Sequence, residues 1–166
     1  MFCVLKYNHY LCSVNQMSGM KANEKMAYDR LTACGLKPSV QRLAIMEYLL
    51  THNTHPTVED VFKALGKKIP TLSKTTVYNT LRLFSENSAA QMLTIDERRV
   101  CYDGIIEPHV HFFCRKCGKI YDVRSVEAPR PVSAGMVVDG NVVDEVQLYY
   151  KGLCADCAAG QDKKDK

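Results

Sequence analysis

Two pairs of closely spaced cysteines constrain this chain more than any other feature of its sequence. The first pair is Cys114-x-x-Cys117, which a glycine follows, and the second is Cys154-x-x-Cys157. Each pair can present two thiolates on a tight turn, and four thiolates together favour zinc or an iron–sulfur cluster. Two disulfides or buried thiols are the less favoured alternative. We therefore predict a structural zinc site with the ligands Cys114, Cys117, Cys154 and Cys157.

Nitrogen and oxygen donors surround the first cysteine pair. They are Asp103, His109, His111 and Asp122. In a strand, His109 and His111 point to the same face because side chains alternate, and a returning strand can bring Asp122 back beside them. Asp103 or Asp122 taken alone is more typical of a solvated turn, whereas for His109 and His111 a solvated surface strand is the less favoured alternative. Together they predict a second metal site with the composition of a sensor.

Length and charge bound the possible fold and partners. The chain has 166 residues and a formal net charge of +4, which leaves room for one ordinary domain or two small ones, and we favour two. Basic residues outnumber acidic ones between residues 21 and 103 and balance them from Gly104 onward, a modest indication of phosphate contact in the first half. We find no signal-peptide or membrane-span pattern, so we expect a reducing cytoplasm with the paired cysteines on metal.

Four helices are expected in the first half of the chain. Asn23 can cap a first helix that Gly35 ends, and Ser39 can cap a second that continues to Thr51. Thr57 can cap a third helix, which ends at Gly66. In the second helix we predict an apolar stripe that faces the core, formed by Val40, Leu43, Met46, Leu49 and Leu50.

A fourth helix, beginning at Ser73, has two faces of different chemistry. Val77, Leu81 and Phe84 form the predicted core side. The opposite side carries donors and acceptors of the kind that read base edges in a major groove, although an ordinary amphipathic surface helix is the alternative. Two strands expected at 91–95 and 99–102 would complete a winged helix. We assign DNA contacts to Arg42, Lys74, Thr75, Tyr78, Asn79 and Arg82.

The second half predicts a small α/β domain stapled by zinc. We expect strands at 119–123 and 146–150, a hairpin turn at Asp139-Gly140-Asn141, and sheet edges suited to a second subunit. Pro129 and Pro131 discourage a long helix near them. The predicted fold class is α+β, an N-terminal winged-helix DNA-binding domain followed by a small C-terminal α/β dimerisation domain with the four-cysteine zinc site. The predicted divisions are an extension at 1–20, disordered or preceding the true start, the winged helix at 21–103, a hinge at 104–108, the dimerisation domain at 109–158 and a charged tail at 159–166.

Several short motifs are spread along the chain from about Lys21 to Cys157. They are Pro38-x-x-Gln41-Arg42, His55-Pro56-Thr57, Thr76-Val77-Tyr78-Asn79-x-Leu81, His109-x-His111, Cys114-x-x-Cys117-Gly118-Lys119 and Cys154-x-x-Cys157. Together these motifs resemble the ferric uptake regulator family of dimeric, metal-dependent repressors.

Within that family the chain most resembles the peroxide-sensing repressors, whose regulatory metal is held by three histidines and two aspartates. Iron-sensing members commonly have glutamate where this chain has Asp122. The resemblance implies Fe²⁺ or Mn²⁺ at the regulatory site beside a structural Zn²⁺, no small organic cofactor, no membrane partner, and a homodimer that binds a palindromic operator. It also implies that peroxide oxidises His55 or His109 when iron is bound, which releases the operator. The implied regulatory ligands are His55, Asp103, His109, His111 and Asp122.

The sequence departs from the family pattern in two places. Residues 143–150 contain no histidine, so we expect an accessory metal site there to be absent or weak. Asn87-Ser88-Ala89 stands where a Ser-Gly turn is usual, at the exit from the fourth helix.

Other functions stay open at this point. Within the family the alternatives are an iron-, manganese- or zinc-responsive repressor, the last because Cys101 lies on the same side of a strand as Asp103. We do not expect an enzyme, but a zinc-containing thiol–disulfide oxidoreductase is the alternative of another class, and a zinc-ribbon adaptor without DNA binding is a third. We assign no role to Cys3, Cys12, Cys34 or Cys101.

Overall fold

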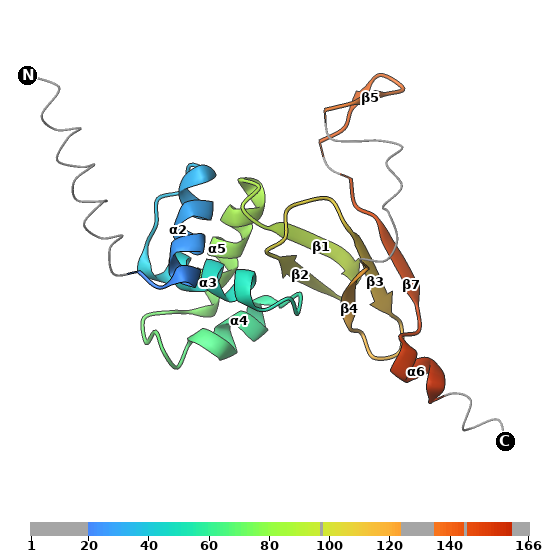
Figure 1. Ribbon diagram of the computed structural model, residues 1–166, viewed down its shortest axis with the longest axis horizontal. Helices are drawn as coiled ribbons and strands as arrows, with labels where there is room; N and C mark the ends of the chain where they lie inside the picture. Colours follow the sequence, from blue (N-terminus) through green and yellow to red (C-terminus); the bar gives the residue numbers. More distant parts are fainter. Residues whose placement is uncertain (1–19, 97, 124–134, 145, 161–166) are drawn as a thin grey trace, which may run out of the picture. The chain divides into compact units, whose positions relative to one another are not determined.

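The structure is a computed structural model that describes residues 20–96, 98–123, 135–144 and 146–160 (Figure 1). The chain forms two compact units. Unit 1 takes Met1–Met92 and Tyr102–Ile105, and unit 2 takes Leu93–Cys101 and Ile106–Lys166. The predictions made for most of the N-terminal extension, for the segment with the two prolines and for most of the charged tail lie outside the described residues. The predicted division at residues 103, 104 and 108 stays a prediction.

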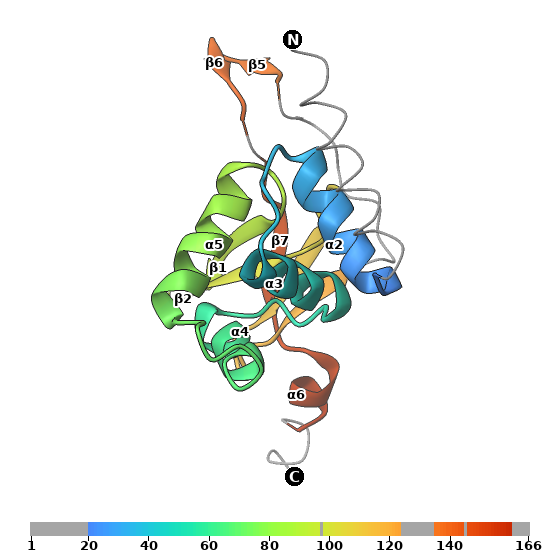
Figure 2. The same ribbon diagram turned by 90° about the vertical axis from the view of Figure 1, so that its left-hand side faces the viewer.

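Four helices form most of the described part of unit 1. They are α2 (Ala22–Ala33), α3 (Val40–Thr51), α4 (Val58–Leu65) and α5 (Lys74–Glu86). Helix α3 contacts each of the other three (Figure 2). Their apolar faces meet in one core, whose most deeply buried side chains include Ala27, Leu31, Ile45, Met46, Val61, Val77, Leu81 and Phe84.

Three of the four predicted helix starts are confirmed. The side chains of Ser39, Thr57 and Ser73 each accept a hydrogen bond from the backbone N–H three residues later, and Thr57 forms a reciprocal capping box. The predicted cap at Asn23 is wrong, since α2 begins after Lys21 without a side-chain cap. Burial of α2 against α3 can hold such an uncapped start, because packing contributes more to a helix in a protein than its ends do.

The predicted core face of α3 needs one correction. Val40 is 75% exposed, whereas Ile45, which we did not place in the stripe, is fully buried. Val40 is the first residue of the helix, and the buried residues of α3 lie further along it. The buried face therefore centres on Ile45, Met46 and Leu49.

A two-stranded hairpin follows α5, as predicted. Its strands are β1 (Gln91–Asp96) and β2 (Arg99–Asp103). The chain leaves α5 through Ser88, whose φ of 53° lies in the left-handed region that glycine favours. The hydrogen bond from the N–H of Ala89 to the carbonyl of Phe84 closes this exit at 2.8 Å.

Unit 2 is built on a three-stranded sheet in the order β4-β3-β7. Its strands are β3 (Val110–Cys114), β4 (Ile120–Val123) and β7 (Tyr149–Gly152), with β4 antiparallel and β7 parallel to β3. A second apolar cluster joins the hairpin to this sheet, because Leu93, Ile95 and Cys101 pack with Phe113 and Ile120. The hairpin residues of unit 2 are thus anchored on β3 and β4.

Several boundaries in unit 2 differ from the predictions. The strands β5 (Val137–Val138) and β6 (Asn141–Val142) flank a two-residue turn, not a three-residue one. Asp139 and Gly140 both have positive φ, as a type I′ turn requires, so Asn141 already belongs to the strand. The last strand begins at Tyr149 instead of Val146, and the short helix α6 (Ala155–Ala159) was not predicted.

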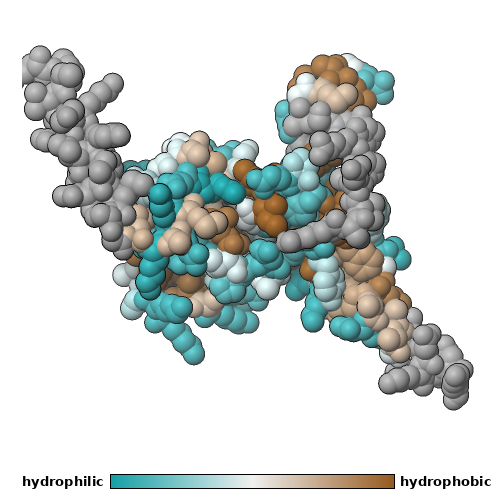
Figure 3. Space-filling model, viewed as in Figure 1, coloured by the Kyte–Doolittle hydropathy of each residue, from teal (hydrophilic) through white to brown (hydrophobic). Residues whose placement is uncertain are grey.

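The β5–β6 hairpin exposes apolar side chains (Figure 3). Val137 and Val142 are 64% and 66% exposed. Within the described part of the chain, no helix has the length and apolar character needed to span a membrane.

Candidate metal centres and helix face

The four cysteines of the two pairs come together in unit 2. Cys114 ends β3, Gly118 makes the knuckle turn with a φ of 70°, and Cys154 precedes α6. The four Sγ atoms lie within 4.8 Å of one another, and those of Cys117 and Cys154 are 3.8 Å apart. Thiolates about 2.3 Å from a tetrahedrally coordinated ion also lie about 3.8 Å from one another. All four are thiols, so their arrangement fits a zinc ion and not two disulfides.

Hydrogen bonds divide charge unevenly among these thiols. The backbone N–H groups of Cys117 and Cys154 donate to the sulfur of Cys114 and lower the pKa of Cys114 to about 6. A hydrogen bond to Cys154, together with burial, raises the pKa of Cys157 to about 12. The backbone N–H of Cys157 and the Tyr121 hydroxyl both donate to Cys154 and lower its pKa. The site thus favours negative charge on Cys114 and Cys154, as a cation site should.

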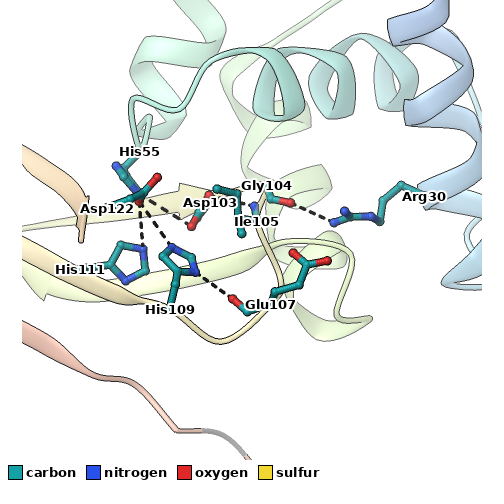
Figure 4. Close-up of polar contacts among 9 residues, drawn as sticks. All are labelled: Arg30, His55, Asp103, Gly104, Ile105, Glu107, His109, His111 and Asp122. Atoms are coloured by element: carbon teal, nitrogen blue, oxygen red, sulfur yellow. Dashed lines mark hydrogen bonds and ion pairs between the residues drawn. The ribbon is translucent and has the colours of Figure 1, made fainter. Parts of the chain in front are cut away.

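Unit 1 contributes a buried histidine and a buried aspartate that face each other. His55 lies in the loop before α4, and Asp103 ends β2. They are 5% and 4% exposed, and Nε2 of His55 is 3.9 Å from Oδ2 of Asp103 (Figure 4). Two donor atoms that each lie about 2.1 Å from one ion are about 3–4 Å apart. The spacing suits two ligands of one metal ion better than a direct hydrogen bond.

The backbone fixes the positions of both side chains. The N–H of Tyr102 donates to the carbonyl of Pro56 at 3.0 Å, which ties the loop of His55 to the strand of Asp103. Oδ1 of Asp103 accepts the N–H of Ile105 at 2.9 Å, so Oδ2 is the oxygen that faces His55. His55 itself has a φ of 49°, a left-handed conformation that tertiary contacts must hold in place.

Unit 2 brings together the other three predicted donors. His111 and Asp122 are directly opposite in the β3–β4 ladder, so the returning strand places Asp122 as predicted. Oδ1 of Asp122 lies 3.5 Å from Nε2 of His109 and 3.9 Å from Nε2 of His111 (Figure 4). Nδ1 of His109 is 2.8 Å from the carbonyl of Glu107, which can only accept. Nδ1 therefore donates to this carbonyl, and Nε2 is the ring nitrogen that faces Asp122.

The chemistry of these donors is distinct from that of the cysteine site. Imidazole nitrogens and carboxylate oxygens suit Mn²⁺ and Fe²⁺, whereas a thiolate would favour zinc. Cys101 is 2% exposed and packs among Leu93 and Ile95, within the apolar cluster of unit 2. The apolar packing of Cys101 weakens the prediction of a zinc sensor.

Helix α5 presents the predicted polar face to solvent. Lys74, Thr75, Tyr78, Asn79 and Arg82 are all exposed. Two of the cations have acidic partners, since Lys74 is 2.6 Å from Glu59 and Arg82 is 2.7 Å from Glu86. Arg42 lies on α3 and donates to the carbonyl of Lys37 at 2.8 Å.

A groove beside α5 contains residues that sequence reasoning did not place in a site. It has a volume of about 410 Å³ and lies between the start of α3 and α5. Two of the residues assigned to DNA, Arg42 and Asn79, line it. The sequence motif around Gln41 and Arg42 marked this region as one of interest, but a motif alone does not show that these residues line a groove. Its other lining residues are Lys37, Pro38, Ser39, Gln41, Thr76 and Thr80.

Several named bacterial regulators are similar in sequence to this chain over most of its length. The peroxide operon regulator of Bacillus subtilis (strain 168) is 36% identical over 140 residues, spanning 84% of this chain and 97% of that protein. The peroxide-responsive repressor PerR of Staphylococcus epidermidis is 32% identical over 127 residues, spanning 76% of this chain and 85% of that protein. Among solved structures, the ferric uptake regulator from Francisella tularensis with iron matches with a TM-score of 0.59 and 25% identity, covering 75% of this chain and 96% of that one.

The family model agrees with these relatives. It matches residues 33–149, from the end of α2 to the start of β7, and so includes the His55–Asp103 pair, the second donor group and the first cysteine pair. This protein belongs to the ferric uptake regulator family.

Proposed function

We propose that this protein is a metal-dependent, DNA-binding transcriptional repressor that senses hydrogen peroxide, and that it is not an enzyme. The observation that carries the proposal is the thiolate-free donor set of three histidines and two aspartates, with aspartate at position 122. Relatives named as peroxide-responsive regulators at 30% identity or more support it.

The proposed metal assignment uses both donor chemistries. Zn²⁺ at Cys114, Cys117, Cys154 and Cys157 stabilises unit 2 as a structural ion. One regulatory Fe²⁺ or Mn²⁺ takes ligands from both units: His55 and Asp103 from unit 1, and His109, His111 and Asp122 from unit 2. An ion bound in this way stabilises only the arrangement in which both groups reach it, so its affinity difference between arrangements drives the switch.

The proposed DNA contacts belong to unit 1. Helices α4 and α5 with the β1–β2 hairpin have the order of a winged helix, and α5 would be the helix that enters the major groove. Tyr78 and Asn79 would read base edges, while Arg42 and the groove beside it would contact the backbone. We further propose that unit 2 pairs two chains into a homodimer that binds a palindromic operator in the cytoplasm. Lys74, Thr75 and Arg82 complete the proposed contact set.

Peroxide would release the operator by oxidising a ligand. An Fe²⁺ ion held by the five proposed ligands would supply the redox chemistry that opens the O–O bond of peroxide, with no net change in its own oxidation state, and the two electrons would come from the imidazole. One oxygen atom of peroxide ends on a ring carbon of His55 or His109, and the other leaves as water, so the imidazole is oxidised by two electrons and peroxide is reduced. Because an oxidised ring is a poorer nitrogen donor, the metal affinity falls and repression is relieved. Mn²⁺ would support DNA binding without this oxidation.

The decisive test is mass spectrometry of the peptides that contain His55 and His109. The protein is loaded anaerobically with Fe²⁺ or with Mn²⁺ and then treated with a small excess of peroxide. We expect one added oxygen on either histidine in the iron sample alone. Unmodified histidines in both samples, with the metal still bound, would instead support an iron- or manganese-responsive repressor.

A second experiment tests DNA binding itself. Tyr78→Ala and Arg82→Ala should each weaken Mn²⁺-dependent operator binding by roughly tenfold or more, since a good base contact contributes about 1–3 kcal/mol. Thr32→Ala, at an exposed threonine of α2, serves as the control. Unchanged operator binding by both α5 variants would show that α5 does not contact the DNA, whereas absence of operator binding by the wild-type protein would favour the adaptor without DNA-binding function.

One structural observation bears on the oxidoreductase alternative. The second cysteine pair does follow a strand and open a helix, α6, as redox pairs do. Its Cys154 lies in the four-thiol cluster, however, where the sulfur of Cys117 from the other pair is 3.8 Å away. Disulfide-reductase activity in the zinc-loaded protein would be needed to restore that alternative.

A further inference from the structure

We propose that Arg30 is a positioning residue of the regulatory metal site, although it is not itself a ligand. This inference rests on the proposed role of Asp103 as a ligand. Arg30 lies on α2, far from Asp103 in sequence, and no motif singles it out. All of the contacts that carry the proposal lie within unit 1.

The guanidinium of Arg30 joins two backbone segments. Its Nη1 donates to the carbonyl of Gly104 at 2.9 Å (Figure 4). The same nitrogen donates to the carbonyl of Ala89 at 3.2 Å. Ala89 is fully buried at the exit of α5, and Gly104 is the residue directly after Asp103. Arg30 therefore fastens the turn of Asp103 to the end of the proposed recognition helix.

The turn that Arg30 holds also sets the orientation of the carboxylate. The N–H of Ile105 donates to Oδ1 of Asp103, and this bond requires the 103–105 backbone to keep its bend. Gly104 is the middle residue of the bend, and Arg30 restrains its carbonyl. Loss of the restraint would let the bend relax and Oδ2 move away from His55.

The opposite side of the turn is restrained by close packing. A Cβ at Gly104 would lie 2.9 Å from the carbonyl oxygen of Leu49 at the end of α3. The bend thus sits between a hydrogen-bond donor from α2 and the backbone of α3. Residues that hold a ligand in place typically change metal affinity by about 10- to 100-fold when they are removed.

The test is Mn²⁺ affinity of the full-length, zinc-loaded protein with Arg30→Met. This variant keeps the apolar stem and removes both hydrogen bonds. We expect about tenfold weaker Mn²⁺ binding, with unchanged zinc content and with a changed Co²⁺ absorption spectrum at the same site. The matched control is Lys25→Met, which removes a positive charge from an exposed position of the same helix.

A second variant keeps the proposal open to contradiction if Arg30→Met folds poorly. Gly104→Ala displaces the same bend from the α3 side and should also lower the Mn²⁺ affinity. Arg30→Lys can keep one hydrogen bond and should therefore retain part of the affinity that Arg30→Met loses. Combining Gly104→Ala with Arg30→Met should cost less than the sum of the two, because both act on one turn.

The outcomes separate this inference from the proposed function. Asp103→Asn, which alters a proposed ligand, should lower the Mn²⁺ affinity more than any of these variants. One outcome contradicts the inference alone: Asp103→Asn loses Mn²⁺ binding, but the Arg30 and Gly104 variants bind Mn²⁺ with the affinity of the control Lys25→Met. In that case Arg30 is not a positioning residue, and the proposed metal site stands. If Asp103→Asn keeps wild-type affinity, the proposed ligand set fails, and the inference fails with it.

Discussion

His55 and Ser88 have the left-handed backbone conformation that residues other than glycine seldom adopt. Both have φ near 50°, and each sits at a junction between elements. For His55 the contacts around the proposed site offset the strain, because Pro56 is hydrogen-bonded to Tyr102. Ser88 is exposed, so its side chain contributes little to compensate.

Ser88→Gly should stabilise unit 1 by about 0.5–1 kcal/mol, since glycine adopts the left-handed region without a steric cost. The measurement is urea unfolding of the zinc-loaded protein. Ser85→Gly is the matched control inside α5, and it should instead destabilise by about the same amount. A loss of stability in Ser88→Gly would show that the serine side chain contributes a bond that compensates for its strain.

The pair of Glu59 and Lys74 predicts a specific response to acid. The hydrogen bond from Lys74, 2.6 Å away, lowers the pKa of Glu59 below its ordinary value. A lowered folded pKa stabilises the fold above the unfolded pKa, and that contribution is lost as pH falls through the folded pKa. We therefore expect Lys74→Met to flatten the decline of unfolding free energy below the ordinary glutamate pKa of 4.5. Lys63→Met, beside the same carboxylate at 3.8 Å, is the control that should change it less.

Local patterns predicted the donor group of unit 2 better than that of unit 1. His111 and Asp122 follow from strand alternation and from a short antiparallel return, both of which are local. The approach of His55 to Asp103 depends on the bond between Pro56 and Tyr102, which joins distant parts of the chain and leaves no periodic signal. Asp103 was a candidate ligand from the sequence itself, but its pairing with His55 followed only from resemblance to the family.

At the scale of elements, polar caps were the most reliable local signal. Ser39, Thr57 and Ser73 were each predicted as caps and confirmed. Elements defined by long-range pairing were predicted poorly, because β7 owes its limits to a parallel neighbour, β3, and not to its own alternation. The helix α6 has only five residues, too few for a periodic pattern.

The N-cap of α5, Ser73, contributes to stability and can be tested by mutation. Ser73 Oγ accepts the N–H of Thr76 at 3.0 Å and contacts its hydroxyl at 2.8 Å. Ser73→Ala should cost about 1 kcal/mol of unfolding free energy and should also weaken operator binding, because the first turn of α5 carries Lys74 and Thr75. Ser39→Ala, at the start of α3, should cost a similar free energy. Equal operator affinity in Ser73→Ala and wild type would show that the first turn of α5 does not contact DNA.

At the scale of the whole molecule, the central prediction is that one ion takes ligands from both compact units. Hydrogen exchange can test this directly through two backbone amides. The N–H of Tyr102 bonds to Pro56 in unit 1, and the N–H of His111 bonds to Leu148 in unit 2.

Mn²⁺ at about 100 times its dissociation constant should slow exchange at both amides, with up to about 2.7 kcal/mol of added protection where exchange requires release of the metal. Asp122→Asn should abolish the effect at Tyr102 as well as at His111. Protection confined to His111 would mean that the ion binds unit 2 alone.

The interleaving of the two units along the chain limits how the protein can be recombined with its relatives. Because 93–101 fold with unit 2 and 102–105 return to unit 1, no single crossover point separates the two. A chimera joined after Met92 would separate Tyr102 and Asp103 from the loop of His55. One joined after Ile105 would place the hairpin of a relative on unit 2 of this chain. The side chains of that hairpin would have to pack against Phe113 and Ile120, and the residue in place of Arg99 would have to donate to the carbonyl of Gly118. Under the proposed function, DNA specificity should therefore change by substitutions on α5 more readily than by exchange of whole units with relatives.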